Sequence, residues 1–487
     1  MTQRDSTSLR AEVIVIGSGP GGALTACLLS EAGRNVLLIE EGGDDPQSSC
    51  EPFSSQEMLT KYRNGGVTVA LGRTNVLYVE GRNCGGGSEI NSGIVGRVAG
   101  ETLDDWRRTH AVETLSEADL APCFAANGRE LRTSVPAAPA PAARKLQEGA
   151  TRLGWQSADL ERLVRVDAGE GGGPTRARRE SMTETFIPRA LRAGCRMLSR
   201  TRALHISRAG SEWQVLLERT APGHSPNQSP VRLTARAASL FVAGGAVQTP
   251  ALLRRSGFKT NVGNSLHLHP MVKVVAQFPD DVVADDWSMP SHQIREFSPR
   301  LGFGCSISKP AYLATILLSN PENLPLLDAH WRKMAAYYTT TRGGVGTVRV
   351  LPGFRDPLVR YHLGDADLRE LSEGLARLCE VLFAAGATAV FPGIAGQPAL
   401  RSVADLALIP DPLPQARTSV STVHLMASCP LGENRSVCAA DSFGQVHGQA
   451  GLYIADASLF CGAIGTNPQA TVMALARRNA EHFLSRQ

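Results

Sequence analysis

The sequence predicts an α/β protein (α+β overall), with one domain built on a parallel sheet and a second domain built on an antiparallel sheet. Three observations lead to this fold class. The chain opens with an apolar run, a glycine-rich turn and a helix-like segment. Its middle part reads as several strands and one long amphipathic helix. From residue 451 to the end, the strand-and-helix pattern of the beginning returns.

The N-terminal segment has the pattern of a βαβ unit. Residues 12–16 are mostly β-branched and apolar, which is typical of a strand buried on both faces. A glycine-rich turn leads to an expected helix over residues 23–32, and the second strand is expected over residues 36–39. Glu40 follows that strand directly. This order is typical of a Rossmann-like, nucleotide-binding domain.

The turn Gly17-Ser-Gly19-Pro-Gly-Gly22 indicates how this domain would hold a dinucleotide. Gly17 permits the tight turn, Gly19 lets the backbone approach a pyrophosphate, and Gly22 lets the helix pack closely on the strand. The positive end of the helix would face the phosphates, and the Glu40 carboxylate could accept hydrogen bonds from a ribose diol. A single fingerprint at the start of the chain favours a permanently held flavin over NAD. The alternative is a tight turn that binds no ligand.

Several later segments are expected to be irregular. An irregular stretch is expected near residues 100–165, inserted in the first domain. The prolines of residues 136–143 predict a surface linker, because proline lacks the amide proton that a helix or a central strand needs. Residues 168–175 and 222–230 are interpreted as loops, and the basic cluster of residues 176–179 as a solvated loop.

Residues 270–415 predict the second, antiparallel-sheet domain, which would bind the substrate. Their strands are expected at residues 272–278, 346–351 and 358–362, and a long helix at residues 365–386. A strand at 452–455 and a helix at 469–486 then complete the first domain, which is therefore discontinuous. The predicted domains are residues 1–269 with 416–487, and residues 270–415.

Composition excludes several classes of protein. The net charge is +4 and the basic residues are scattered, whereas nucleic-acid binding needs a concentrated basic face. No apolar run reaches the length of about 18 residues that a membrane span needs. The ten cysteines have irregular spacings with no Cys-x-x-Cys pair, so no metal site is expected. Reduced thiols and a polar N-terminus without an apolar core favour a cytoplasmic protein.

Four segments together resemble the glucose–methanol–choline (GMC) oxidoreductases. They are the N-terminal glycine motif with residues 40–43, the segment 81–94, the segment 243–257 and, most specifically, the segment 424–478. The nearest branch is that of choline-dehydrogenase-like and long-chain-alcohol-oxidase-like proteins. The resemblance implies bound FAD. Some members tether the flavin through a histidine, but the matching position here is Ile90, so noncovalent FAD is expected.

The resemblance also implies which residues contact the cofactor. Asn91 and Ile94 would lie beside the flavin ring, and Asp456 and Ala457 would contact the ribityl-phosphate, mostly through their backbone. Leu204 would meet the adenine. The cofactor-binding set is thus Gly17, Gly19, Gly22, Glu40, Gly86, Ser88, Asn91, Ile94, Leu204, Asp456, Ala457 and Asn467. The chain departs from the family pattern at four positions of the C-terminal motif. Ala427 replaces the usual Gly, Leu431 replaces the usual Met, and Cys461 stands where a Pro is common. Pro430 follows the cysteine of the motif.

His424 and Asn467 are the candidate catalytic pair. Alcohol oxidation removes a hydroxyl proton and a hydride from one carbinol, and an imidazole is suited to take the proton near neutral pH. Asn467 could donate a hydrogen bond to the same oxygen, and the hydride would pass to flavin N5. A lone histidine before an apolar run is more often a core residue than a base, so the surrounding motif carries this assignment.

The function expected from these residues is the oxidation of a small or medium alcohol, with O₂ or another compound as electron acceptor. The few charges in residues 301–327 favour an apolar or moderately polar alcohol over a sugar. The alternatives are a redox-neutral, hydroxynitrile-lyase-like reaction and a non-catalytic flavin scaffold. Two or three of five side chains are expected to line the substrate pocket: Trp287, His292, Tyr312, Tyr337 and Tyr338.

Overall fold

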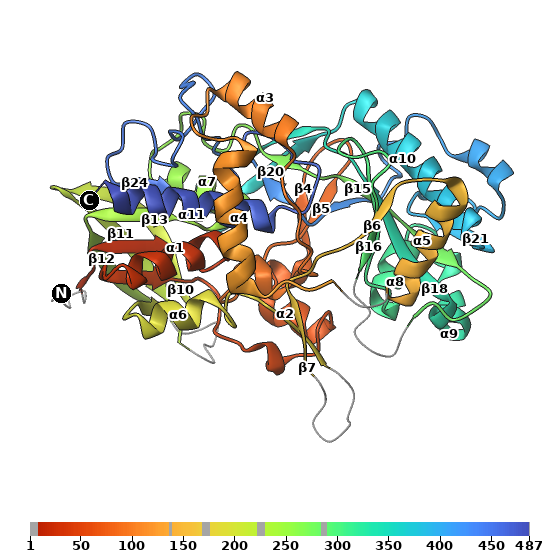
Figure 1. Cartoon of the computed structure of the whole chain (residues 1–487), viewed down its shortest axis with the longest axis horizontal. Helices are drawn as coiled ribbons and strands as arrows, with labels where there is room; N and C mark the ends of the chain where they lie inside the picture. Colours follow the sequence, from red (N-terminus) through yellow and green to blue (C-terminus); the bar gives the residue numbers. More distant parts are fainter. Residues whose placement is uncertain (1–7, 136–138, 168–175, 222–228, 284–289, 487) are drawn as a thin grey trace.

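The structure is a computed structural model, and it describes residues 8–135, 139–167, 176–221, 229–283 and 290–486. The expected loops at residues 168–175 and, for the most part, 222–230 lie outside the described residues, as does Trp287. Figure 1 shows two sheet-containing halves side by side, with both chain termini in the half at the left. The predicted α/β class, with a parallel and a mainly antiparallel sheet, is confirmed.

The first half is built on a five-stranded parallel sheet in the order β24-β13-β2-β3-β9. The side chains of β2 alternate between two cores. Val13 and Val15 pack with the helices on one face, whereas Ile14 and Ile16 pack toward a second sheet of four strands on the other face. Burial on both faces explains the unbroken apolar run. The five strands are β2 (Val13–Ile16), β3 (Val36–Ile39), β9 (Arg196–Leu198), β13 (Ser239–Val242) and β24 (Leu452–Ile454).

The elements around this sheet come from both ends of the chain, as expected for a discontinuous domain. The helices α1 (Pro20–Glu31), α6 (Phe186–Arg192) and α11 (Gln469–Ser485) lie against one another on one face. The four-stranded sheet on the other face contains β1 (Ser8–Arg10), β10 (Thr201–Ala209), β11 (Glu212–Arg219) and β12 (Val231–Ala237). The helix α7 (Gly245–Arg255) follows β13 directly.

The second half is built on a nine-stranded sheet whose pairings are antiparallel except that between β5 and β22. Val272, Val274 and Ala276 of the central strand β15 pack in the same core as the long helix α10, whereas Val275 packs in a core with α8 on the opposite face. The strands are β4 (Thr68–Ala70), β5 (Val76–Tyr78), β6 (Ser157–Asp159), β15 (Met271–Gln277), β16 (His292–Ile294), β17 (Gly302–Cys305), β18 (Met334–Thr340), β21 (Ala389–Pro392) and β22 (Val420–Thr422). The helices are α5 (Pro141–Leu153), α8 (Pro310–Leu317), α9 (Leu326–His330) and α10 (Asp365–Ala384).

This sheet takes strands from outside residues 270–415, so its extent differs from the predicted second domain; the domain bounds stay a prediction. The remaining helices are α2 (Ser55–Lys61), α3 (Gly100–His110) and α4 (Glu117–Leu131). The remaining strands form three hairpins or short pairs: β7 (Val164–Asp167) with β8 (Arg176–Arg179), β14 (His267–Leu268) with β23 (Leu425–Met426), and β19 (Val345–Arg349) with β20 (Leu358–His362).

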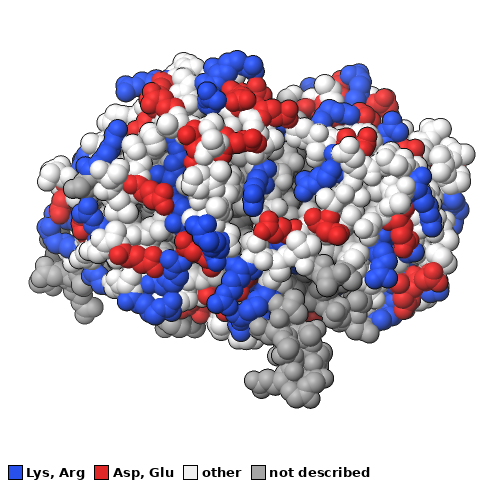
Figure 2. Space-filling view, in the orientation of Figure 1, with Lys and Arg blue, Asp and Glu red and all other residues white. Residues whose placement is uncertain are grey.

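Two sequence expectations about irregular structure were wrong. The stretch near residues 100–165 holds the helices α3, α4 and α5. The linker expected at residues 136–143 overlaps the start of α5, because Pro141 is the first residue of that helix. The first helical residue has no intrahelical acceptor for its amide, so the proton that proline lacks is not needed there. Charged residues of both signs are interspersed over the face seen in Figure 2, and no helix among the described residues could span a bilayer.

Candidate functional site

A cavity of about 590 Å³ is lined by residues from both halves of the molecule. One end is formed by the glycine turn after β2 and by the loop that contains residues 81–94. The other end is formed by one face of the nine-stranded sheet, through side chains of β15, β16, β18 and β22. His424 and Asn467 lie on the wall of the same cavity. The predicted nucleotide-binding turn and the predicted catalytic pair therefore share one site.

The glycine turn is shaped by backbone contacts on one side and is open on the other. Gly17 has φ +101°, and a Cβ there would lie 2.2 Å from the carbonyl oxygen of Ala243. A Cβ on Gly22 would lie 2.0 Å from the carbonyl oxygen of Gly17, so both positions require glycine. Gly19 differs, because nothing lies within 4 Å of the position of its missing Cβ. It lines the cavity just before α1 begins at Pro20, which fits a pyrophosphate at the positive end of that helix.

Glu40 lies at the edge of the same turn, but its carboxylate is already engaged. Oε2 accepts hydrogen bonds from the backbone N (3.0 Å) and the Oγ (2.7 Å) of Ser18, and Oε1 accepts one from the backbone N of Gly42 (2.7 Å). Burial raises the pKa of this carboxyl group. A carboxylate can accept about four hydrogen bonds, so a ribose hydroxyl can still be added to these three. The contact of Glu40 with a ribose stays a prediction, whereas its hydrogen bonds with Ser18 and Gly42, which hold the turn, are observed.

The loop containing the second motif lies against the glycine turn. A Cβ on Gly86 would lie 2.9 Å from Cα of Gly19, so the two glycine segments are in direct contact. Gly86, Asn91 and Ile94 line the cavity, as expected for residues beside a flavin. Ser88 does not line it: its Oγ donates to the carbonyl of Gly85 (2.7 Å) and accepts from the backbone N of Met182 (3.0 Å). Ser88 therefore holds the loop from behind.

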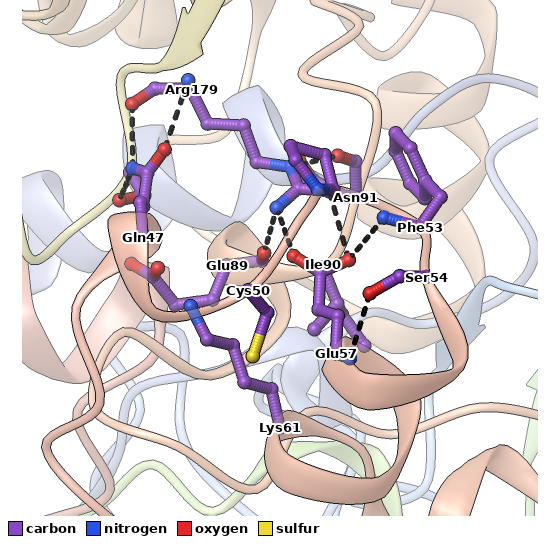
Figure 3. A network of polar contacts seen from close by, with 12 residues as sticks. Gln47, Cys50, Phe53, Ser54, Glu57, Lys61, Glu89, Ile90, Asn91 and Arg179 are labelled. Carbon is purple, nitrogen blue, oxygen red and sulfur yellow. Dashed lines mark hydrogen bonds and ion pairs between the residues drawn. The ribbon is translucent and has the colours of Figure 1, made fainter.

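A buried ion pair also holds this loop, and sequence analysis missed it. Figure 3 shows Arg179 of β8 reaching across the loop to Glu57 of α2. Arg179 Nη1 lies 2.7 Å from Glu57 Oε1, and both side chains are at most 3% exposed. The same guanidinium donates to the backbone carbonyl oxygens of Asn91 (2.9 Å) and Glu89. The interpretation of residues 176–179 as a solvated loop was thus wrong, because a run of arginines does not reveal which of them meets a distant carboxylate.

Asp456 fixes a third wall of the cavity. Its carboxylate accepts hydrogen bonds from the backbone N atoms of Gly245 and Ser458, both at 2.8 Å, and from the hydroxyl of Thr249. These contacts tie the start of α7 to the C-terminal segment, and both Asp456 and Ala457 line the cavity. Leu204 and Gly22 do not line it. The neighbour of Leu204 on β10, Ala203, does, so the adenine contact of Leu204 stays a prediction.

The predicted catalytic side chains lie together with a second histidine. Asn467 Nδ2 lies 3.3 Å from His424 Nε2, and His424 Nδ1 lies 3.0 Å from His269 Nδ1. His269 Nε2 accepts a hydrogen bond from the backbone N of Gly465 at 3.0 Å. His269 is 2% exposed. It stands in the segment Leu268-His269-Pro270, where no local pattern indicates its contact with His424.

The contacts with Gly465 and with Asn467 favour different positions for the ring protons of the two histidines. A backbone N–H only donates, so His269 Nε2 must accept, and neutral His269 then carries its proton on Nδ1. That proton points at His424 Nδ1, which accepts it. Neutral His424 would then carry its own proton on Nε2, whereas a hydrogen bond from Asn467 Nδ2 needs a free Nε2 and the proton on Nδ1. Burial lowers the pKa of His424 to about 4 and that of His269 well below its usual value, so both rings are neutral near pH 7.

The aromatic side chains expected in the substrate pocket divide clearly. Tyr312 and Tyr338 line the cavity. Tyr337, the neighbour of Tyr338 in sequence, points into the opposite core, where its hydroxyl donates to the carbonyl of Ala142 (2.9 Å). His292 is buried, with Nδ1 lying 2.8 Å from Asp159. Among the described residues, no group of three or more His, Cys, Asp or Glu side chains is arranged to hold a metal ion.

Comparison with known proteins gives consistent matches over nearly the whole chain. Models of the GMC oxidoreductase family match residues 58–271 and 319–476, and a model of an NAD(P)-binding Rossmann-like domain matches residues 15–46. The chain is 37% identical over 489 residues to the GMC-type oxidoreductase y4nJ of Sinorhizobium fredii, covering 98% of this chain and 95% of that protein. It is 24% identical over 515 residues to the long-chain-alcohol oxidase FAO4A of Arabidopsis thaliana, covering 96% and 68%. The crystal structure of pyridoxine 4-oxidase from "Mesorbium loti" superposes with a TM-score of 0.73 at 18% identity, covering 98% and 99% of the two chains.

Proposed function

The chain belongs to the GMC oxidoreductase family, and from this premise we propose that it oxidises the CH–OH group of a small or medium alcohol. Family membership confirms the resemblance and the expected cofactor, FAD. One observation carries the proposed reaction: His424 and Asn467 lie 3.3 Å apart on the wall of the cavity that also contains the glycine turn. An alcohol bound there would meet both side chains beside the cofactor.

The proton transfer falls to His424. The hydroxyl proton of the substrate passes to Nε2, and the Asn467 amide donates a hydrogen bond to the oxygen as negative charge develops on it. For Nε2 to be free, the ring proton of His424 must move to Nδ1. His269 must then accept at Nδ1 and give up its hydrogen bond from Gly465. When bound, FAD supplies the hydride acceptor at its N5 atom.

The described residues fit a noncovalently held FAD. The open side of Gly19 and the start of α1 would take the pyrophosphate, and the segment of Gly86, Asn91 and Ile94 would face the flavin ring. Ile90 lines the cavity with a side chain that cannot form a covalent bond to the flavin. The roles of the individual residues, and a cytoplasmic location, stay predictions.

The electron acceptor is proposed to be O₂, because relatives of this chain are named long-chain-alcohol oxidases and its structural neighbour is named an oxidase. A panel of alcohols mixed anaerobically with the purified protein tests the proposal: at least one should bleach the flavin, and the same alcohol in air should yield peroxide. Turnover of a substrate without bleaching would instead favour the redox-neutral lyase. A preparation that contains no flavin would contradict both.

A further inference from the structure

Lys273 is a positively charged side chain on the wall of the cavity, opposite the glycine turn. It lies on β15, on the same face as Met271, and both residues line the cavity. Across the sheet it pairs with Tyr338 of β18, which also lines the cavity. Paired residues of neighbouring antiparallel strands project to the same side. Lys273 and Tyr338 are therefore adjacent groups on the sheet side of the proposed substrate site.

The amine of Lys273 has no partner among the described residues. No carboxylate and no hydrogen-bond acceptor contacts it, and burial is the sole cause that lowers its pKa. Two arginines on the cavity wall, in contrast, are paired with an acid: Arg63 lies 2.8 Å and Arg202 lies 3.5 Å from the carboxylate of Glu41. Lys273 is half-buried, so its amine is reached from the cavity and is partly removed from water. An anionic ligand in the cavity would supply the partner that the described residues do not.

The carboxylates that line the cavity pair with groups other than the Lys273 amine. The lining acids are Glu40, Glu41, Glu80 and Asp456. Glu40 and Asp456 are held by backbone N–H groups of the nucleotide-binding turns, and Glu41 and Glu80 are held by Arg63. As far as the chain is described, Lys273 is the only charged side chain that strands of the nine-stranded sheet contribute to the cavity.

Tyr338 provides a second donor beside the amine. Its oxygen accepts a hydrogen bond from Gln293 Nε2 at 3.1 Å, which leaves the phenolic proton available. Burial raises the pKa of Tyr338 to about 12, so the group stays protonated and can only donate that proton near pH 7. An ammonium and a phenol on one face of a sheet form a donor pair that is suited to the two oxygens of a carboxylate.

We propose that the alcohol oxidised by this protein also carries a carboxylate, which binds Lys273 and Tyr338 while the hydroxyl faces His424 and Asn467. This inference rests on the proposed function and names its substrate class, a hydroxy acid. Lys273 follows His269, the partner of His424, by four residues, which corresponds to roughly 13 Å along an extended chain. This spacing leaves room for several carbon atoms between the two groups, as in an ω-hydroxy acid.

Flavin reduction by ω-hydroxyhexanoate and by its methyl ester, measured anaerobically on the holoenzyme, tests the inference. The acid should reduce the flavin with a kcat/KM about tenfold or more above that of the ester, since an ion pair out of water is a charge-assisted contact. Lys273→Met should remove this preference by weakening only the acid, and Lys273→Arg should restore part of it. The exposed Lys259→Met is the control for the loss of one positive charge.

Binding of hexanoate, which has no hydroxyl group to oxidise, separates this inference from the proposed function. Hexanoate should perturb the flavin absorbance of the wild-type holoenzyme and of Lys259→Met but not of Lys273→Met. An ester that reacts as well as the acid, or hexanoate binding that survives Lys273→Met, would overturn the hydroxy-acid assignment while leaving alcohol oxidation intact. If neither the acid nor its ester reduces the flavin although other alcohols do, the hydroxy-acid assignment is overturned and alcohol oxidation stands. If no alcohol of the panel reduces the flavin, the proposed function fails, and hexanoate binding alone tests the anion site at Lys273.

Discussion

The Nδ1 atoms of His269 and His424 lie 3.0 Å apart, and the two imidazole rings are nearly perpendicular at 89°. Because Gly465 donates to Nε2 of His269, neutral His269 carries its proton on Nδ1 and can donate it to Nδ1 of His424. A hydrogen bond donated to the free nitrogen of a neutral imidazole stabilises the neutral form and lowers its pKa. We therefore expect His269 to act as a positioning residue that orients His424 and favours its neutral form.

Replacement of His269 by alanine should change the pH profile of flavin reduction. In the wild type, a His424 pKa of about 4 keeps the base neutral, so the rate should stay constant with falling pH until the pH approaches that value. His269→Ala removes the donor to Nδ1 and admits water, which raises the pKa of His424 toward the ordinary value of about 6.5. The acidic limb of the profile should then move upward by one or more pH units, measured by stopped-flow reduction without O₂.

His267→Ala is the matched control for that experiment. His267 is also a largely buried histidine with a pKa lowered to about 4, but its Nδ1 contacts the carbonyl of Ser265 and not His424. Its removal should leave the acidic limb in place. A slower His269→Ala enzyme with an unshifted profile would mean that His269 only fills space beside the catalytic histidine.

Replacement of His424 by glutamine should leave FAD bound but slow the reductive half-reaction. Loss of a positioned base typically costs about 10²–10⁴-fold in rate, and glutamine keeps a side chain of similar polarity in the cavity. Single-turnover flavin reduction with an alcohol from the panel measures the change. The control is His447→Gln, because His447 lies outside the cavity and contacts the carbonyl of Gly432. Normal reduction in His424→Gln would rule out its role as base.

Gly19→Ala should separate cofactor binding from folding. The added methyl group meets no protein atom within 4 Å, and Gly19 has an ordinary extended backbone, so the apoprotein should unfold at the wild-type temperature. The methyl group projects instead toward the proposed pyrophosphate. Overpacking by one methyl group costs about 1–3 kcal/mol, which corresponds to roughly fivefold to 150-fold in the Kd for FAD.

Gly22→Ala is the contrasting variant, because its methyl group would collide with the backbone of Gly17 at 2.0 Å. It should destabilise the apoprotein itself. Unchanged FAD affinity in Gly19→Ala, measured by titration of apoprotein, would place the pyrophosphate elsewhere.

Breaking the buried pair of Glu57 and Arg179 should loosen the loop beside the flavin. Glu57→Gln removes a carboxylate that lies 2.7 Å from a guanidinium that is 3% exposed, and removal of one partner of a buried pair costs about 3–5 kcal/mol. Since Arg179 also donates to the carbonyls of Glu89 and Asn91, FAD should dissociate below the temperature of global unfolding. Flavin fluorescence and circular dichroism, followed in one thermal scan, distinguish the two events. The double variant Glu57→Met/Arg179→Met should be more stable than Glu57→Gln alone; the reverse order would contradict the argument.

The elements that the sequence predicted well are those whose signals are local. The βαβ unit over Val13–Ile39 combines a run of apolar residues with a glycine spacing, and both depend on neighbours in the chain. The same holds for the long helix α10, whose apolar face repeats along consecutive turns. By contrast, Pro141 was assigned to a linker because proline disfavours helices in general, although it is compatible with a first helical residue.

The parts of the site that sequence analysis missed depend on contacts between distant segments. Glu57 meets Arg179 across 122 residues of sequence, and His269 meets His424 across 155. No local pattern marks either pair. Lys273 was missed for a different reason: a lysine in an apolar strand reads as a snorkelling surface residue until the cavity beside it is known. The sequence thus singled out His424 and Asn467, which the structure brings together, whereas their contact with His269 and the position of Lys273 required the fold.

Ala427 stands where the family usually has glycine, and its backbone explains that usage. It has φ +63°, in the left-handed region that costs a residue with a Cβ roughly 1 kcal/mol or more. The position is fully buried between His424 and Cys429, and its N–H donates to the carbonyl of Ala457 (2.9 Å), so the chain cannot relax this conformation without breaking the contact.

Ala427→Gly should therefore stabilise the protein by about 0.5–1 kcal/mol despite the greater freedom of glycine in the unfolded chain. Chemical denaturation of the apoprotein measures the change. Ala26→Gly in the middle of α1, where glycine weakens the helix and removes a buried methyl group, should shift stability in the opposite direction. Equal destabilisation by both substitutions would contradict the argument. It would show that the packing of the Ala427 methyl group stabilises the protein by more than the left-handed backbone conformation destabilises it.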